Sequence, residues 1–403
     1  MTYKKCIYCN EEKEDKDFSL EHIFPDSLGG SITNEIFKTR QVCRRCNSLS
    51  GLYIDSLFVK NFFATTSTIF SNYLGFYDFD KNPYIPFSYM GFVNYIKHPK
   101  YKYCEKWLWC GGSIAYHFHN NSEEDFNMIA GGDPRKRKGN NAGEVYLVGL
   151  TDNEFWINLL LNAFFKQFKK SEMILVNYEM VGRKTNLNEE QLKIKNSLFK
   201  IHQKKGMQKH SLPIKIDFNI RFQAKLSLGL GYSLFGEKFA ESEEAIFYRN
   251  IFWNKKYEKL IELQPQMMPF FSEQKNGLNE FMQFLNFKGC HGLFFLILNN
   301  TLVFYGNLFG EGQYPILTVI TNRLDQYQHI LLNTYPNGWG YILSPQRELF
   351  IGEFDILAII AYNTGNKSFL PKLIELEKKY KDINELPPFN LNKKKTNKTS
   401  DDE

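Results

Sequence analysis

The sequence predicts an α+β protein with a small cysteine-rich domain at its N-terminus and a larger mixed body behind it. The first part of the chain is polar and rich in cysteine and turn residues, unlike the rest. In the remainder, apolar residues recur with helical periods in some segments and strand periods in others, without the strict alternation of a parallel sheet. No glycine-rich phosphate loop is present. A length of 403 residues suits two or three domains.

Composition and charge restrict the class of protein. An apolar fraction of 43% with 23% charged residues is globular, which excludes a wholly disordered or collagen-like chain. The net charge of +6 is too small to indicate a nucleic-acid partner by itself. Seven cysteines are too few for a disulfide scaffold, and no apolar run approaches the ~18 residues of a membrane span. Because no apolar signal segment follows Met1, we expect a cytoplasmic protein with reduced thiols.

The elements follow from the periodicity of the apolar residues. Residues 213–222 alternate cleanly between apolar and polar side chains, which predicts a half-buried strand. The other expected strands are 113–119, 144–150, 172–180, 291–298, 301–308 and 315–321. The expected helices are 47–63, 153–170, 223–259 with a break at Gly236, 354–361 and 368–381.

We expect four regions along the chain. Residues 1–63 form the N-terminal domain, and residues 64–225 form a mixed α+β region with basic stretches. Residues 226–389 form an α+β C-terminal region, and residues 390–403 form a solvated tail.

Two Cys-x-x-Cys pairs predict a metal site in the N-terminal domain. Cys6 and Cys9 form the first pair, and Cys43 and Cys46 form the second. Each pair is a tight turn that presents two sulfurs on one side, so the pairs can supply four thiolates to one tetrahedral zinc ion. The alternatives are a plain zinc ribbon that stabilises a small domain, or a redox pair. The redox interpretation is weaker because we expect neither pair to open a helix after a strand in a thioredoxin-like unit.

The segment between the pairs carries a second motif. Residues 21–30 read Glu-His-Ile-Phe-Pro-Asp-Ser-Leu-Gly-Gly, and Asn47 directly follows the second pair. This combination resembles the zinc-ribbon branch of the HNH endonucleases, which have the ββα-metal fold. The resemblance covers about residues 6–63 and does not extend further. It implies a β-hairpin and a helix held together from the rear by zinc, with a separate divalent ion for the chemistry.

The resemblance also implies roles for individual residues. His22 matches the general base, Glu21 the acidic ligand of the catalytic metal, and Asn47 its final ligand. The family's middle asparagine falls shortly before the second cysteine pair, where this chain has no asparagine, and Asn34 is the nearest one. Either Asn34 reaches in from a longer turn, or this branch holds His22 in another way. The alternative for His22 is a structural residue or an unused zinc ligand.

These residue types suit phosphodiester hydrolysis. An imidazole with a pKa of ~6.5 can accept the proton of the attacking water at neutral pH. One Mg²⁺ or Mn²⁺ held by a carboxylate and an amide oxygen can support the phosphate and the leaving oxygen. Because adjacent strand side chains point to opposite faces, a bulge or bend near Pro25 is expected to re-aim Glu21 or His22. Gly29 and Gly30 allow a tight turn with positive φ.

The resemblance leads to two hypotheses for the whole chain. In the first, it is a metal-dependent endonuclease that cuts DNA, double-stranded in our expectation, and its body selects the target or gates the nuclease. Similar HNH modules occur in bacterial defence proteins, some of which sense a cyclic oligonucleotide while others pair with a short Argonaute and its guide. That resemblance implies an antiviral or anti-plasmid effector. In the second hypothesis, the chain is a catalytically inactive zinc-ribbon protein that binds nucleic acid.

Two basic stretches are candidate phosphate contacts. Nine basic residues against one acid lie between Leu192 and Lys225, a local charge of +8, and Lys215 and Arg221 would face outward from the expected strand. A solvated face is an equally good interpretation of that stretch. The second stretch is a run of four consecutive cations between glycines, which suits an exposed loop that meets nucleic acid. Its members are Arg135, Lys136, Arg137 and Lys138.

A further pair of side chains lies outside these motifs. His117 and His119 alternate on an expected strand, so both imidazoles share one face and could bind a metal or a ligand. Such a pair is more often a polar strand face.

Overall fold

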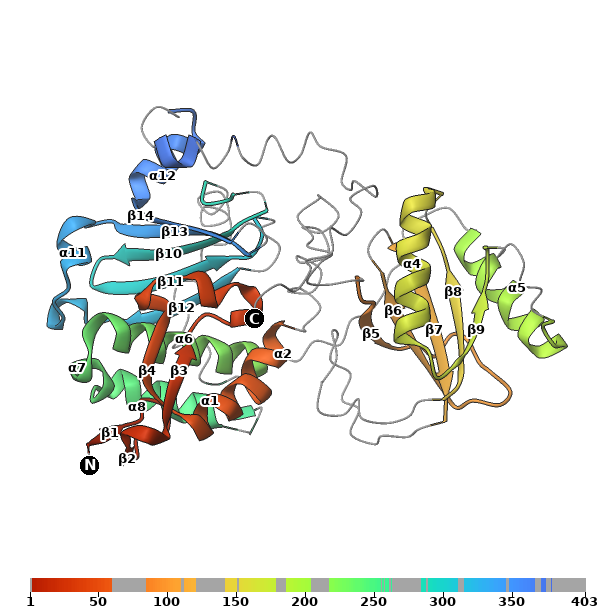
Figure 1. The fold of residues 1–403 in the computed structure, drawn as a ribbon, viewed down its shortest axis with the longest axis horizontal. Helices are drawn as coiled ribbons and strands as arrows, with labels where there is room; N and C mark the ends of the chain where they lie inside the picture. The colour runs from red at the N-terminus through yellow and green to blue at the C-terminus, as the bar shows by residue number, and fades with distance from the viewer. Residues whose placement is uncertain are drawn as a thin grey trace, which may run out of the picture.

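The structure of the chain is a computed structural model. It describes residues 2–59, 85–109, 112–120, 142–150, 152–178, 186–203, 217–254, 256, 258–260, 262, 284–287, 289–310, 315–345, 348–366, 371–374 and 378. In these ranges the chain is a mixture of helices and sheets, as the sequence predicts. The described strands form two five-stranded sheets and two small hairpins (Figure 1).

The N-terminal segment has the expected hairpin followed by a helix. A first hairpin consists of β1 (Tyr3–Lys5) and β2 (Glu12–Glu14), and a second consists of β3 (Phe18–His22) and β4 (Lys38–Cys43). The helix begins at Arg44, slightly before the expected start. It continues as α1 (Arg44–Ser50), a π-helical turn (Gly51–Asp55) and α2 (Ser56–Val59).

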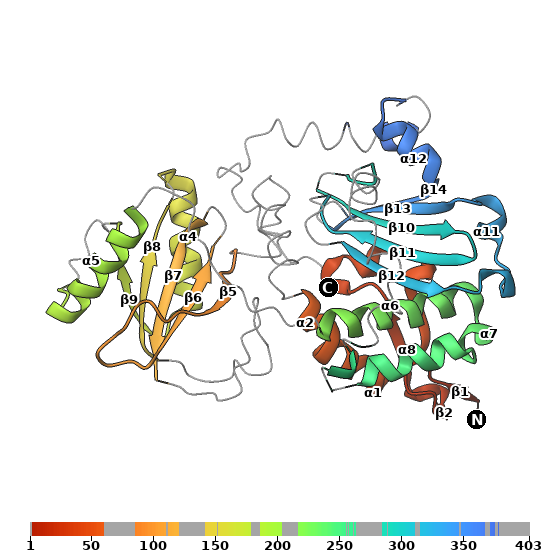
Figure 2. The ribbon, with the colours of Figure 1, turned by 180° about the vertical axis from the view of Figure 1, so that it is seen from behind.

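The middle of the chain forms one sheet with a helix on each face. Its strand order is β5-β6-β7-β8-β9, antiparallel except for the parallel pair β8 and β9. The strands are β5 (Ser88–Phe92), β6 (Tyr103–Leu108), β7 (Ile114–His119), β8 (Glu144–Val148) and β9 (Glu172–Leu175). Helices α4 (Glu154–Gln167) and α5 (Glu189–Gln203) pack into two separate cores on opposite faces of this sheet (Figure 2).

The C-terminal sheet is antiparallel throughout, in the order β12-β11-β10-β13-β14. Its strands are β10 (His291–Leu298), β11 (Thr301–Asn307), β12 (Ile316–Thr321), β13 (Gly338–Ser344) and β14 (Leu349–Asp355). Two helices accompany it, α11 (Ile330–Thr334) and α12 (Ile356–Asn363). The expected turn between β10 and β11 is present, with Asn299 at a φ of 56°. Helix α12 packs on one face of the sheet, and the other face meets the N-terminal segment.

Helices α6 (Asp217–Phe235), α7 (Glu237–Ala240) and α8 (Glu243–Trp253) follow α5 in the chain and precede the C-terminal sheet. The strand predicted at 213–222 is therefore wrong from residue 217 onward, because α6 begins there. Every second residue from Ile220 to Leu230 is apolar, which mimics a strand, yet the residues between them are also largely buried. A helix buried on nearly all sides loses its 3.6-residue signature. Helix α6 runs without a break across residue 225, so the region boundary expected at this residue lies inside a helix.

The N-terminal segment shares one hydrophobic core with α6, α8 and the C-terminal sheet. The ring of Phe37, just before β4, packs edge-on against Tyr341 of β13, with ring centroids 5.5 Å apart. Phe58 of α2 stacks on Phe222 of α6 at 3.8 Å and 11°. These contacts fix the N-terminal segment against the body by apolar packing, which is the main source of stability in such an interface. Figures 1 and 2 show the hairpin, α6 and the sheet side by side in both views.

Two glycines shape the loop after β3. Gly29 has a φ of +92°, a left-handed backbone conformation that residues other than glycine rarely adopt. At Gly30 the requirement is space, because a Cβ there would lie 1.9 Å from the carbonyl oxygen of Phe24. The turn that the sequence predicts at Gly29 and Gly30 thus needs a positive φ at the first glycine and close backbone approach at the second.

Within the described ranges, no helix combines the length and the apolar character that crossing a membrane requires.

The contact between α6 and Ile23, the residue that follows β3, gives a first prediction. A Cβ at Gly229 of α6 would lie 2.6 Å from Cγ2 of Ile23, which is itself fully buried. We expect Gly229→Ala to destabilise the protein by about 1–3 kcal/mol through overpacking, although alanine favours helices. The measurement is the midpoint of urea unfolding. Gly51→Ala is the control, since a Cβ there meets nothing within 4 Å and should cost nothing. A Gly229→Ala protein as stable as the wild type would contradict the close packing of α6 on Ile23.

Candidate functional site

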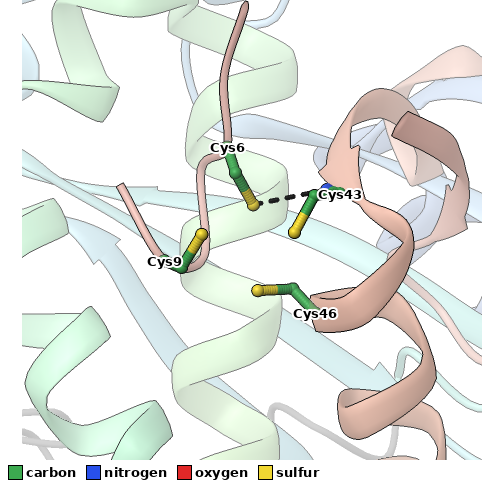
Figure 3. A group of neighbouring side chains, drawn as sticks. All are labelled: Cys6, Cys9, Cys43 and Cys46. Carbon is green, nitrogen blue, oxygen red and sulfur yellow. Dashed lines mark hydrogen bonds between the residues drawn. The ribbon is translucent and has the colours of Figure 1, made fainter. Parts of the chain in front are cut away.

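The four cysteines of the two pairs converge on one point. Cys6 and Cys9 lie on the loop between β1 and β2, Cys43 ends β4, and Cys46 lies in the first turn of α1 (Figure 3). The second pair therefore does open a helix after a strand, but that strand belongs to a two-stranded hairpin and not to a thioredoxin-like unit. Their sulfur atoms all lie within 4.8 Å of one another. A tetrahedral zinc ion with Zn–S bonds of ~2.3 Å separates its ligands by about 3.8 Å. The cluster therefore has the ligand type and the spacing of a four-thiolate zinc site.

The hydrogen bonds around the sulfurs also suit a cation. The Cys6 sulfur accepts hydrogen bonds from the Cys46 thiol and the backbone N–H of Cys43, which lower its pKa to about 5 against the effect of burial. Burial instead raises the pKa of Cys9 to about 12, and the hydrogen bond to Cys6 raises the pKa of Cys46. Without a cation the four thiols cannot all ionise together. A zinc ion removes that conflict, because a coordinating thiol is deprotonated.

Helix α8 forms hydrogen bonds to the backbone between the two cysteines of the first pair. Arg249 Nε donates a hydrogen bond to the carbonyl oxygen of Ile7 at 2.8 Å. The indole N–H of Trp253 donates to the carbonyl oxygen of Tyr8, also at 2.8 Å. Both carbonyls lie between Cys6 and Cys9, so α8 positions the loop that presents these sulfurs. The zinc site is thus built partly by residues far along the chain.

The strand that carries the catalytic candidates is irregular. In the β3–β4 hairpin, Ser19 faces Val42 and Glu21 faces Thr39, so β4 has one extra residue between these pairs. The bulge expected near Pro25 lies instead just before Glu21. The side chain of Glu21 is buried, whereas His22 is half-buried. The two neighbours consequently meet different surroundings, as adjacent strand residues do.

The Glu21 carboxylate forms a buried ion pair with the body. Lys225 of α6 is fully buried, and its Nζ lies 2.8 Å from Glu21 Oε1. The same ammonium donates a hydrogen bond to the carbonyl oxygen of His22 at 3.1 Å and lies 2.6 Å from Asp55 Oδ2. The Tyr8 hydroxyl donates to Glu21 Oε1 at 3.2 Å. One ammonium therefore links both motif residues of β3 to the end of the π-helical turn.

The electrostatics of this cluster depend on Lys225. Burial lowers the pKa of Lys225, but Asp55 and Glu21 outweigh it, so the net shift is upward and the ammonium stays charged. Burial raises the pKa of Asp55 to about 6, although Lys225 opposes that shift. The carboxylates of Glu21 and Asp55 thus share one cation, and the buried Asp55 Oδ1 has no hydrogen-bond partner among the described residues.

Three residues of this site, Lys225, Asp55 and Tyr8, are not predicted from the sequence. By its spacing Lys225 belongs to the stretch of nine cations that suggests a phosphate contact or a solvated face. The signal that could have found it is its place inside the apolar run 220–230, where a lysine needs a buried partner. Asp55 follows Asn47 by about two helical turns, and Tyr8 lies inside the first cysteine pair, but neither spacing identifies a partner.

The two asparagines have different local roles. Asn47 Nδ2 donates hydrogen bonds to Ser19 Oγ at 3.0 Å and to the carbonyl oxygen of Leu20 at 2.8 Å, which ties α1 to β3 beside the motif. Asn34 Oδ1 accepts from the backbone N–H of Ile36 at 3.3 Å and caps a short 3₁₀ helix. Asn47 is thus hydrogen-bonded to β3, the strand that contains Glu21 and His22. Asn34 instead caps the 3₁₀ helix that leads to β4.

The predicted nucleic-acid contacts are only partly described. Arg135, Lys136, Arg137, Lys138 and Lys215 lie outside the described residues. Arg221 lies on α6, where its Nε donates a hydrogen bond to the carbonyl oxygen of Phe252 at 3.0 Å. The prediction that Arg221 points outward from a strand is wrong, because this residue lies in a helix and is half-buried.

Removal of the zinc ligands gives a second prediction. We expect Cys46→Ser to lose the ion of the four-cysteine cluster and to lower the thermal unfolding midpoint, because the loop that α8 supports then loses its anchor. Metal content by mass spectrometry and the unfolding midpoint are the measurements. The buried Cys104, outside this cluster, is the control: Cys104→Ser should keep the ion. A Cys46→Ser protein with unchanged metal content would contradict the assignment.

Comparisons with known proteins agree with this geometry. Residues 6–63 match the family model described as HNH endonuclease. No curated protein and no solved structure matches the chain. The matched range begins at Cys6 and includes the four cysteines, β3, β4, α1 and α2. The sequence resemblance is thereby confirmed, and residues 6–63 are an HNH endonuclease domain with a four-cysteine cluster that fits zinc.

Proposed function

We propose that the chain is a DNA endonuclease of the HNH type whose activity is held back by α6 of its own body. The observation that carries the proposal is the ion pair between Lys225 and Glu21, which joins the body to a motif residue of the matched domain. The defence role and the activating partners, a cyclic oligonucleotide or a guide-loaded short Argonaute, belong to the proposal and rest on the resemblance alone.

His22 is the proposed general base. Lys225 binds the backbone carbonyl of His22, which fixes the strand and leaves the imidazole outside that bond. A half-buried imidazole can accept the proton of a water that attacks a phosphodiester. Its neighbour across the hairpin is Lys38, whose cation favours a phosphate nearby.

Asn47 is the proposed amide ligand of a catalytic cation. Because its Nδ2 is bound to β3, the Oδ1 of the same amide is the atom left for a hard ion such as Mg²⁺ or Mn²⁺. Such an ion supplies charge stabilisation to the phosphate and to the leaving oxygen. The first turn of α1 adds the positive end of a helix dipole near Asn47.

Glu21 does not fit a divalent cation in the described arrangement. Its carboxylate is 2% exposed, and an ammonium already lies 2.8 Å from Oε1. A divalent ion and an ammonium in the same place repel each other strongly at low dielectric. We therefore propose that Glu21 becomes a metal ligand only after Lys225 withdraws. Movement of α6 would supply the gate that is expected of the body.

Substitution of Lys225 tests this gate. We expect Lys225→Met to cut plasmid DNA in Mg²⁺ or Mn²⁺ at least tenfold faster than the wild type, because Glu21 is released. Loss of one partner of a buried ion pair costs about 3–5 kcal/mol. The Lys225→Met/Asp55→Asn double variant removes one of the stranded carboxylates and keeps the test possible if the single variant unfolds. Lys238→Met is the control, since this exposed lysine of α7 donates to the carbonyl oxygen of Gln326.

The same assay tests the base and separates two failures. Adding His22→Ala to the Lys225→Met protein should reduce cleavage about 10²–10⁴-fold, the usual contribution of a general base. If the wild type already cuts as fast as Lys225→Met, the gate is wrong and the nuclease stands. If cleavage survives His22→Ala, the assignment of the base is wrong.

The same ion pair also favours a second function. If Lys225 permanently takes the place of the cation, the domain is a catalytically inactive zinc-ribbon module that binds nucleic acid. Absence of cleavage by folded Lys225→Met in both Mg²⁺ and Mn²⁺, together with retained DNA binding, would support this alternative.

A further inference from the structure

A second group of potential metal ligands lies in the middle sheet, away from the HNH domain. Glu105 of β6 and His117 of β7 face each other directly in the antiparallel register, and His119 lies two residues further along β7. Because strand side chains alternate, His117 and His119 share one face. All three residues are buried, with exposed fractions of 2%, 4% and 2%. The sheet thus gathers two imidazoles and one carboxylate in its interior.

The distances between these side chains are those between ligands of a common ion. His119 Nε2 lies 3.3 Å from Glu105 Oε1, and His117 Nδ1 lies 3.6 Å from Glu105 Oε2. The ligand atoms all lie within 4.8 Å of one another. Ligands bound at ~2.0–2.1 Å to a tetrahedral ion are separated by about 3.3 Å. Two imidazoles and a carboxylate form a known ligand set for zinc and for iron.

Neighbouring side chains hold two of the ligands in a metal-binding orientation. Ser171 Oγ lies 3.0 Å from Nε2 of His117, so an Nε2–H that donates to it leaves the lone pair of Nδ1 directed at Glu105. The Trp107 indole N–H donates to Glu105 Oε2 at 3.0 Å. Bonds of this kind fix the tautomer and the orientation of ligands in metal sites.

His119 provides an independent observation. Both of its ring nitrogens are buried, and neither has a hydrogen-bond partner of good geometry among the described residues. A buried polar atom without a partner costs about 1–3 kcal/mol. An ion bound to Nε2 would supply the missing interaction on the side that faces Glu105.

A histidine of the loop between β5 and β6 forms a pair with a glutamate of β8 that needs no metal. His98 Nε2 lies 3.1 Å from Glu144 Oε2, and the backbone N–H of Lys100 donates to His98 Nδ1 at 3.1 Å. Tyr146 donates its hydroxyl to the same carboxylate at 2.7 Å. Both ring nitrogens of His98 are thus used, in contrast to those of His119. A buried histidine that packs on this sheet is thus not necessarily left unpaired.

We propose that Glu105, His117 and His119 bind a divalent transition-metal ion, for which zinc is the reference. The ion links β6 to β7 at one end of the middle sheet. Because the three side chains are almost fully buried, its role is to stabilise the sheet.

Metal content of the full chain tests the proposal. After zinc loading and gel filtration, the wild type should carry one more zinc ion per chain than Glu105→Gln or His119→Ala. The matched control is His98→Gln, which breaks the metal-free pair with Glu144 and should keep the wild-type content. Equal metal content in the wild type and a folded Glu105→Gln would overturn the proposal.

Cobalt keeps the test decisive if the variants do not fold. The cysteine cluster gives cobalt–thiolate charge-transfer absorption, and a nitrogen and oxygen site adds only weak visible bands. In the folded wild type, cobalt should continue to bind after the thiolate absorption has saturated. If binding ends when that absorption saturates, the second site does not exist.

Discussion

One buried ammonium organises the region around the HNH motif. Lys225 meets two carboxylates and a backbone carbonyl, and it comes from a helix of the body. A fully buried charge is tolerable only when such partners surround it. Glu21, His22 and Asp55 therefore depend on α6 for their environment, and α6 depends on them. This mutual dependence makes the body relevant to the chemistry of the domain.

The four-cysteine cluster also depends on the rest of the chain. Its loop is fixed by Arg249 and Trp253 of α8, and its domain shares a hydrophobic core with the C-terminal sheet. The HNH domain is thus built into its body, whereas a separate module would have its own core. A movement of α6 would act directly on the β3–β4 hairpin, because α6 contacts β4. A movement of α8 would act on the loop between β1 and β2, to which it is hydrogen-bonded.

The sequence predicts local features well and long-range partners poorly. The cysteine pairs and most strands of the two sheets follow from spacing and alternation, because these signals are local. The N-terminal hairpin follows from the resemblance of residues 6–63 to the HNH endonucleases. The strand predicted at 213–222 fails because α6 is surrounded by protein, which erases its amphipathic period. The ion pair between Glu21 and Lys225 spans some two hundred positions, and no local pattern encodes such a contact. His117 and His119 are visible in sequence, but Glu105 joins them only through the strand register.

We propose that the ammonium of Lys225 excludes a divalent cation from Glu21 in the resting protein. Manganese binding followed by electron paramagnetic resonance, with the zinc sites filled, measures this most directly. We predict that Lys225→Met binds a manganese ion that the wild type does not, and that Glu21→Gln in the same background abolishes it. A wild-type protein that binds manganese through Glu21 as tightly as the variant would contradict the account.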